Sequence, residues 1–167
     1  MPRVIILTPT AGEEKTALVA AIVTGAESVR FMEVDVREVD VRATSRDQAD
    51  GRQMGADDLF DCDAVVVTSA GVDADKVLVE LLRSAERQRP AEAFSNIVFA
   101  VAGASSGTLL SLVASLGGII VSAPRGIPDP TANARALGQR VATVAEWVRH
   151  ARSHEHGQAH AHSHHHH

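Results

Sequence analysis

Short apolar segments separated by helix-forming segments restrict the folds that this chain can adopt. The apolar runs are residues 4–7, 64–67, 97–102 and 119–121. Each run is apolar throughout instead of alternating with polar residues, which is typical of parallel strands that are covered by helices on both faces. We therefore predict that these runs form the interior of one parallel sheet.

A further segment, residues 30–41, alternates apolar and polar residues and predicts an edge strand. Its alternation slips by one residue after Val36, which predicts a bulge at Arg37 and Glu38. Residues 42–58 then show no periodicity, and we interpret them as a long surface excursion.

Helical patterns follow these strands. The first runs from Glu13 and is expected to end at Gly25, the second spans about 73–89, and the last about 131–152. A shorter one carries Leu109 to Leu116. Because parallel crossovers are right-handed and the second strand is edge-like, we predict a three-layer α/β/α sandwich whose five-stranded parallel sheet has the order 2-1-3-4-5.

Composition fits one globular domain followed by a tail. The chain has 167 residues, of which 45% are hydrophobic and 22% charged, and its net charge is −5 with neutral histidines. This charge excludes a global attraction to nucleic acid or to an anionic membrane. We predict one domain over 1–152 and a disordered histidine-rich tail over 153–167. Cys62 is the single cysteine, so no intrachain disulfide forms and a cytoplasmic location is expected.

Small residues fill the loops that follow three of the interior strands. These loops are residues 8–12, 68–73 and 103–107, and they consist mostly of Gly, Ala, Ser and Thr. Loops of this kind let backbone amides approach a ligand closely. The same composition also suits tight strand-to-helix turns and helix caps, and we expect Ser69, Ser105 and Ser106 to act as caps.

From residue 3 to about 150 the chain resembles the flavodoxin-like proteins, and particularly the NAD(P)H:quinone oxidoreductases of the tryptophan-repressor-binding-protein type. The resemblance rests on the first strand with its loop, on the approach 61–67 to the middle strand, and on Gly117 and Gly118 before the last strand. It implies a flavodoxin-like fold with an FMN phosphate in the first loop and the isoalloxazine ring between the other two. The cofactor-binding set that it implies is Thr8, Thr10, Gly12, Thr16, Thr68, Ser69, Gly71, Gly103, Ser105, Ser106 and Gly107.

The first loop departs from the family pattern Ser-Thr-Thr-Gly-Asn-Thr. Thr10 and Gly12 match it, whereas Pro9 lacks an amide hydrogen and Glu13 and Glu14 place carboxylates where a phosphate would lie. Two unit charges about 4 Å apart interact by roughly 4 kcal/mol at an effective dielectric of about 20, so this repulsion offsets several hydrogen bonds. The three loops also contain no aromatic residue to stack on a flavin. We therefore predict a degenerate FMN site.

The sequence gives little support for nucleophilic catalysis, for a nucleotide-binding loop or for a phosphate-accepting receiver site. We assign no catalytic residue. The chain has no histidine before His150, so a Ser-His catalytic pair is not expected. It also lacks the glycine before lysine of a phosphate-binding NTPase loop and the acidic pair of a response-regulator receiver. Cys62 lies between two aspartates that disfavour its thiolate, and we expect it to be a small core residue.

The tail is the one segment with a metal-binding pattern. Closely spaced imidazoles chelate Ni²⁺, Zn²⁺ or Cu²⁺ with little geometric demand. Both a native metal-binding tail and a purification tag agree with this sequence. The candidate ligands are His154, His156, His160, His162, His164, His165, His166 and His167.

Two functional hypotheses follow. In the first, the protein is a non-catalytic binding or assembly module on a flavodoxin-like scaffold, with a tail that binds metal. In the second, it is an active FMN-dependent NAD(P)H:quinone oxidoreductase with altered loops. Expected partners are a small molecule such as a flavin or quinone, another protein, or a second copy of the chain, but not nucleic acid or a membrane.

Overall fold

The computed structural model describes residues 1–9, 13–39, 61–89, 91–103 and 107–159. Within them lies a five-stranded parallel sheet of order β2-β1-β3-β4-β5, which confirms the predicted order. The predicted excursion 42–58 lies outside the described residues. The strands are β1 (Arg3–Pro9), β2 (Glu33–Val39), β3 (Ala64–Thr68), β4 (Val98–Ala102) and β5 (Ile119–Ile120).

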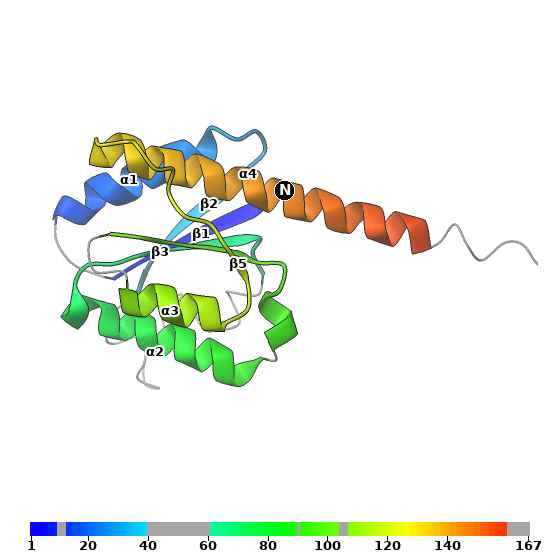
Figure 1. Cartoon of the computed structure of the whole chain (residues 1–167), viewed down its shortest axis with the longest axis horizontal. Coiled ribbons are helices and arrows are strands. Elements are labelled where there is room, and N and C mark those ends of the chain that lie inside the picture. Colours follow the sequence, from blue (N-terminus) through cyan, green and yellow to red (C-terminus); the bar gives the residue numbers. More distant parts are fainter. Residues whose placement is uncertain (10–12, 40–60, 90, 104–106, 160–167) are drawn as a thin grey trace, which may run out of the picture.

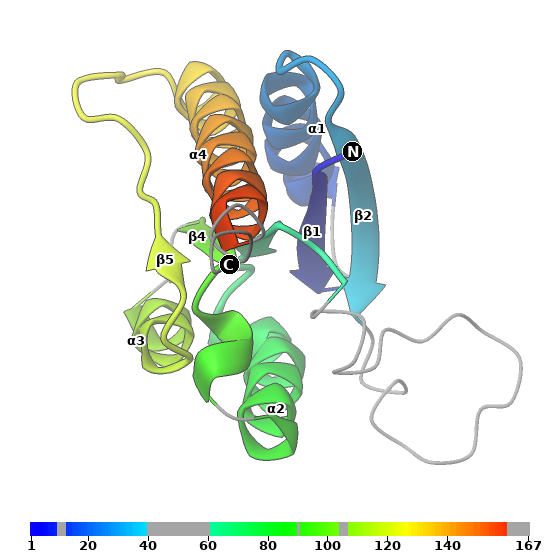
Figure 2. The same ribbon diagram turned by 90° about the vertical axis from the view of Figure 1, so that its right-hand side faces the viewer.

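Helices cover both faces of the sheet, so the molecule has the three layers expected (Figures 1 and 2). Helices α1 and α4 lie on one face, and α2 and α3 lie on the other. A 3-10 helix, η3, precedes β4 and is not indicated by the sequence pattern. The bounds are α1 (Glu13–Glu27), α2 (Val72–Gln88), η3 (Ala91–Phe94), α3 (Gly107–Ser115) and α4 (Pro130–Ala159).

Successive residues of the interior strands fill two separate cores. Val4 and Ile6 of β1 face α1 and α4, while Ile5 and Leu7 face α2 and α3. All four side chains are fully buried. Burying one such side chain contributes about 1.5–3 kcal/mol, so strands that are apolar on both faces need this cover on both sides.

The predicted bulge in β2 is wrong. β2 pairs continuously with β1 from Arg3 opposite Glu33 to Pro9 opposite Val39, and both Arg37 and Glu38 keep partners in this register. Val34 packs toward α1 and α4, whereas Val39 is buried in the core beneath α2. The slip in the apolar pattern therefore arises because β2 buries Val34 on one face of the sheet and Val39, at its end, on the other face.

Gly25 does not end α1, which continues to Glu27. A Cβ atom at Gly25 would lie 1.9 Å from the carbonyl oxygen of Arg135, and one at Gly138 would lie 2.1 Å from the carbonyl oxygen of Ile22. The two glycines thus let the backbones of α1 and α4 touch. The sequence pattern places Gly25 at a helix end because glycine is common there, but here a neighbouring helix requires it.

α4 continues to Ala159, beyond the expected end near Arg152. Its last part extends past the sheet (Figure 1), and the side chains from Ala151 to Glu155 are exposed. No helix in the described part of the chain is both long enough and apolar enough to cross a membrane.

Candidate functional site

The carboxyl ends of β1, β3 and β4 lie at one edge of the sheet, because the three strands are adjacent and parallel. The described parts of the three predicted loops therefore meet there. The amide of Ser69 donates to the carbonyl oxygen of Ala102 at 2.7 Å. A Cβ atom at Gly103 would lie 2.5 Å from the carbonyl oxygen of Ser69, and Gly103 has φ of +107°. Glycine at this position therefore allows the second and third loops to touch.

Two of the predicted threonine ligands hydrogen-bond to the backbone. The Thr68 hydroxyl donates to the carbonyl oxygen of Leu7 at 3.0 Å and links β3 to β1. The Thr8 hydroxyl lies 3.3 Å from the carbonyl oxygen of Pro9. Both side chains are buried. The hydroxyl groups of Thr8 and Thr68 therefore donate to backbone carbonyls of the protein at this edge of the sheet.

Ser69 bonds to Asp75, a residue that the sequence analysis did not identify. The Ser69 hydroxyl donates to Oδ2 of Asp75 at 2.6 Å, and the amide of Ala70 donates to Oδ1 of Asp75 at 2.7 Å. Ser69 and Asp75 are each 5% exposed. An acidic side chain in the first turns of a helix that reaches back to the preceding loop is a recognised capping arrangement, and it is the signal that could have identified Asp75.

Ser69 is not the N-cap that we expected. That position belongs to Gly71, which has φ of +111° and makes no side-chain cap hydrogen bond. A Cβ atom at Gly71 or at Gly107 would contact nothing within 4 Å in the described structure. Among the described residues, the space beside the α-carbon is therefore open at the start of α2 and of α3.

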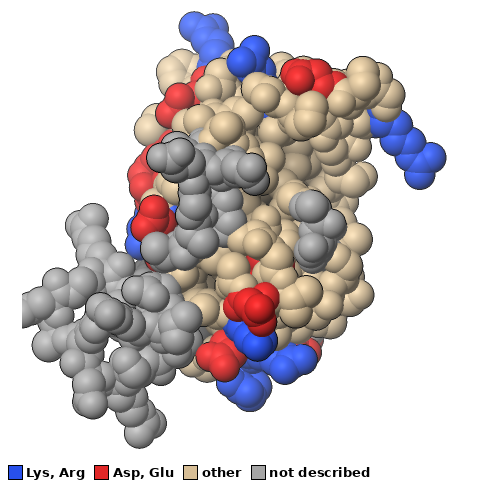
Figure 3. All heavy atoms as spheres, turned by 90° about the vertical axis from the view of Figure 1, so that its left-hand side faces the viewer, with Lys and Arg blue, Asp and Glu red and all other residues tan. Residues whose placement is uncertain are grey.

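The remaining predicted cofactor residues lie where no side-chain contact is described. Thr10, Gly12, Ser105 and Ser106 lie outside the described residues, and Thr16 belongs to α1 without a described side chain. Figure 3 shows the face of the molecule at which the carboxyl ends of the parallel strands lie. Among the described residues on that face, Lys and Arg side chains lie at the rim and not at the centre.

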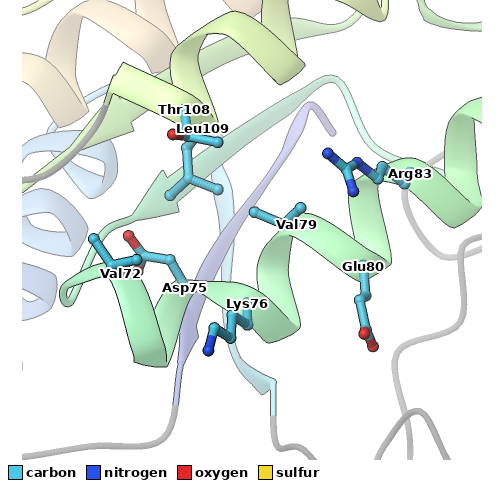
Figure 4. A pocket seen from close by; sticks show the side chains of 8 residues that line it. All are labelled: Val72, Asp75, Lys76, Val79, Glu80, Arg83, Thr108 and Leu109. Atoms are coloured by element: carbon cyan, nitrogen blue, oxygen red, sulfur yellow. The ribbon is translucent and has the colours of Figure 1, made fainter.

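A cavity of about 300 Å³ lies between α2 and α3 (Figure 4). Val79 of α2 and Leu109 of α3 point toward one another across it. Val72 at its edge is 75% exposed. The cavity thus combines an apolar centre with a charged border. Its lining residues are Val72, Asp75, Lys76, Val79, Glu80, Arg83, Thr108 and Leu109.

Cys62 is buried, as expected for a core residue. Burial and the neighbouring Asp63 carboxylate raise the pKa of its thiol to about 12. A thiol with such a pKa is almost entirely protonated at neutral pH, so Cys62 is a poor nucleophile and a poor metal ligand.

Of the predicted metal ligands, His154 has a described side chain, which is exposed on α4. His156 has a described backbone only, and His160, His162 and residues 164–167 lie outside the described residues. The described residues contain no group of three or more His, Cys, Asp or Glu side chains placed to hold a metal ion.

No family model matches the sequence, and no curated protein matches it. Solved structures do match. A diflavin flavoprotein from Nostoc sp. is 13% identical, with a TM-score of 0.59 over 92% of this chain and 97% of that one. This chain has a flavodoxin-like fold.

Two further structures support the same assignment of the fold. A flavodoxin from the domain Archaea is 15% identical, with a TM-score of 0.53 over 87% of this chain and 99% of that one. FerB from Paracoccus denitrificans, a flavoenzyme NAD(P)H:(acceptor) oxidoreductase, is 14% identical, with a TM-score of 0.53 over 89% of this chain and 98% of that one. At these identities the likeness establishes the flavodoxin-like fold and not an activity.

Proposed function

We propose that this protein is a non-catalytic binding or assembly module on a flavodoxin-like scaffold with an eroded FMN site. The observation that carries the proposal is the contact of the second loop with Asp75. The Ser69 hydroxyl and the Ala70 amide both donate to this carboxylate. Two hydrogen-bond donors of the loop that the resemblance assigns to the flavin ring are thus directed toward α2 and not toward a ligand.

The charge of the first loop supports the same proposal. Glu13 and Glu14 begin α1, where the amides of a helix N-terminus would otherwise favour a phosphate. Carboxylates at these positions oppose the binding of a phosphate group. Both loops therefore disfavour FMN, the first through its charge and the second through its hydrogen bonds.

A binding role does not require the flavin edge, because the cavity between α2 and α3 offers a second concave surface. Its volume of about 300 Å³ is at the lower end of the range for small-molecule sites. The partly exposed Val79 and the exposed Val72 offer an apolar contact surface that suits an apolar group of a small ligand or of a protein side chain.

Titration of the full-length protein with FMN tests the proposal, with flavin fluorescence as the readout. We expect no saturation below about 1 mM, which corresponds to about −4 kcal/mol of binding free energy. The double substitution Glu13→Asn and Glu14→Thr should create measurable affinity. Glu27→Gln at the other end of α1 is the matched control and should create none. Micromolar binding by the unmodified protein would contradict an eroded site.

The second candidate function is that of an FMN-dependent NAD(P)H:quinone oxidoreductase. The open space beside the α-carbons of Gly71 and Gly107 favours it, since backbone amides alone can hold a phosphate or a ring where no side chain intervenes. The likeness to FerB, itself an NAD(P)H:(acceptor) oxidoreductase, agrees with this alternative. Micromolar FMN binding together with quinone-dependent oxidation of NADH would support it over a binding module.

We also propose that the histidines of the tail bind Ni²⁺, Cu²⁺ or Zn²⁺. Neutral imidazoles at short spacing are good ligands for these ions. The candidate ligands are His154, His156, His160, His162 and the histidines at 164–167. Replacing all of these except His154 by Gln should lower the number of ions bound per chain in equilibrium dialysis. Unchanged stoichiometry would refute the proposal.

A further inference from the structure

Two histidines meet on the exposed part of α4 that extends past the sheet. His150 and His154 are four residues apart, so they lie one turn apart on the same side of the helix. Their Nε2 atoms are 3.0 Å apart, and the ring centroids are 4.5 Å apart with the ring planes at 79°. Both side chains are exposed, so an ion in solvent can reach them.

The separation of the two nitrogen atoms matches a chelate. Imidazole nitrogens bind transition metals at about 2.0–2.1 Å, so a metal bound to two nitrogens 3.0 Å apart subtends an angle of about 90–97°. This is close to the angle between adjacent ligands in square-planar or octahedral complexes. A tetrahedral zinc site requires a wider separation of about 3.3–3.4 Å at the same bond lengths. The pair therefore suits Cu²⁺ or Ni²⁺, whose nitrogen sites are tetragonal.

The charged side chains around His150 and His154 do not oppose the binding of a cation there. Arg149, next to His150, is directed toward the body of the protein, where its guanidinium donates to the carbonyl oxygen of Met1 at 2.9 Å and to Oδ2 of Asp63 at 3.2 Å. Glu146 is exposed and precedes His150 by four residues, so a carboxylate lies on the same side of the helix one turn earlier. This arrangement places an anionic group, and not a cation, in line with the two imidazoles.

We propose that His150 and His154 form a bidentate site for Cu²⁺ or Ni²⁺ that is built into α4 and does not need the histidines that follow His154. The helix sets the spacing of the two residues, and a hydrogen bond between the rings holds their Nε2 atoms at chelating distance, so a bound metal ion replaces that hydrogen bond and little further ordering is needed. The remaining coordination positions are open to water or to a ligand from another molecule. This inference does not depend on the presence or absence of a flavin site.

The test uses the full-length chain with every histidine after His154 removed as a ligand. In this background His156, His160, His162 and the histidines at 164–167 are replaced by Gln, and Cu²⁺ alone is titrated by calorimetry. We expect one Cu²⁺ per chain. Either His150→Ala or His154→Ala should weaken binding by about a hundredfold, because each leaves a single imidazole without the chelate effect.

A matched variant tests whether Cu²⁺ binding depends on the four-residue spacing of the two histidines or only on their number. The double substitution His150→Ala and Arg152→His keeps the number of imidazoles but places them two residues apart, on different sides of the helix. It should bind as weakly as the single variants. In the background protein, Cu²⁺ should also slow amide hydrogen exchange over 150–155, and the double variant should not show this protection. Equal affinity in the background protein and the double variant, or no Cu²⁺ binding in the background, would overturn the proposal.

Discussion

At the scale of single residues, Asp75 shows how a buried charge shapes the candidate site. Its carboxylate accepts two hydrogen bonds from the loop before α2. Hydrogen bonds to a charged group contribute about 1.5–3 kcal/mol, more than those between neutral groups. The same contacts direct the Ser69 hydroxyl toward α2, so in the proposed function one interaction both stabilises the fold and withholds this donor from a flavin.

Replacing Asp75 by Ala should lower the free energy of unfolding by about 2–3 kcal/mol, because a buried hydroxyl and an amide lose their acceptor. Chemical denaturation monitored by circular dichroism measures this change. Asp73→Ala is the matched control on the same helix turn. The Asp73 carboxylate is 96% exposed and pairs with Lys76 at 3.2 Å, so its loss should leave stability almost unchanged. Equal effects of the two substitutions would show that the Asp75 contacts contribute nothing.

At the scale of elements, the contact of α1 with α4 depends on two glycines that face each other. Gly25 and Gly138 are both buried, and each lies against a backbone carbonyl of the opposite helix. An α-helix gains about 1 kcal/mol when an interior Gly becomes Ala. At these positions an added methyl group would force the two helices apart, and this steric effect is the larger one.

Gly138→Ala should therefore destabilise the protein by about 1–3 kcal/mol despite the gain in helix propensity. Gly107→Ala provides the control, because it adds a methyl group at the start of α3 where no atom of the described residues lies within 4 Å. The control should be neutral or should stabilise by up to about 1 kcal/mol. Thermal unfolding of both variants measures the difference, and a stabilised Gly138→Ala protein would refute the close helix contact.

The pairing of β1 with β2 carries a pH-dependent contribution to stability. The Arg3 guanidinium hydrogen-bonds to Asp35 and lowers the pKa of this carboxyl, with a smaller effect from Arg37 at 3.3 Å. A lowered pKa in the folded state means that the stabilisation is present above the unfolded pKa of about 3.9 and is lost as the pH falls through the folded pKa. Asp35 is 38% exposed, so solvent screening keeps the contribution small.

Asp35→Asn should accordingly lower stability near pH 6 and reduce its decrease between about pH 4 and pH 2. Denaturation curves across this range measure the effect. Glu38→Gln, an exposed position on the same strand, should leave the slope unchanged. An Asp35→Asn protein with the original acid slope would show that the pair does not contribute.

At the scale of the whole molecule, the domain consists of a sheet between two helical layers, and α4 extends beyond them (Figure 1). Val148 packs partly against the core, and Arg149 holds Asp63 and the carbonyl of Met1. Beyond these residues, the side chains from His150 to Glu155 are exposed. The stabilising contacts of α4 with the body therefore end near Arg149.

A chain that ends at Ser153 should keep its free energy of unfolding within about 0.5 kcal/mol, because His154 and Glu155, the first residues removed, are exposed. A chain that ends at Glu146 should be clearly less stable, since it loses Val148 and Arg149. Guanidinium denaturation of both proteins tests the boundary. Loss of cooperative unfolding in the longer of the two would show that the end of α4 belongs to the core.

The order of the strands and α-helices, the three layers and the sheet order could all be predicted from the sequence, because apolar runs without alternation require cover on both faces and crossovers have one hand. The sequence also located the edge of the sheet where the three loops meet. The role of Asp75 and the glycine contact between α1 and α4 were decided by the tertiary structure. Each depends on two groups whose distance is set by packing, and sequence spacing alone does not specify that distance. The pair of His150 and His154 is a local contact within α4, and the sequence pattern missed it because it ended this helix near Arg152.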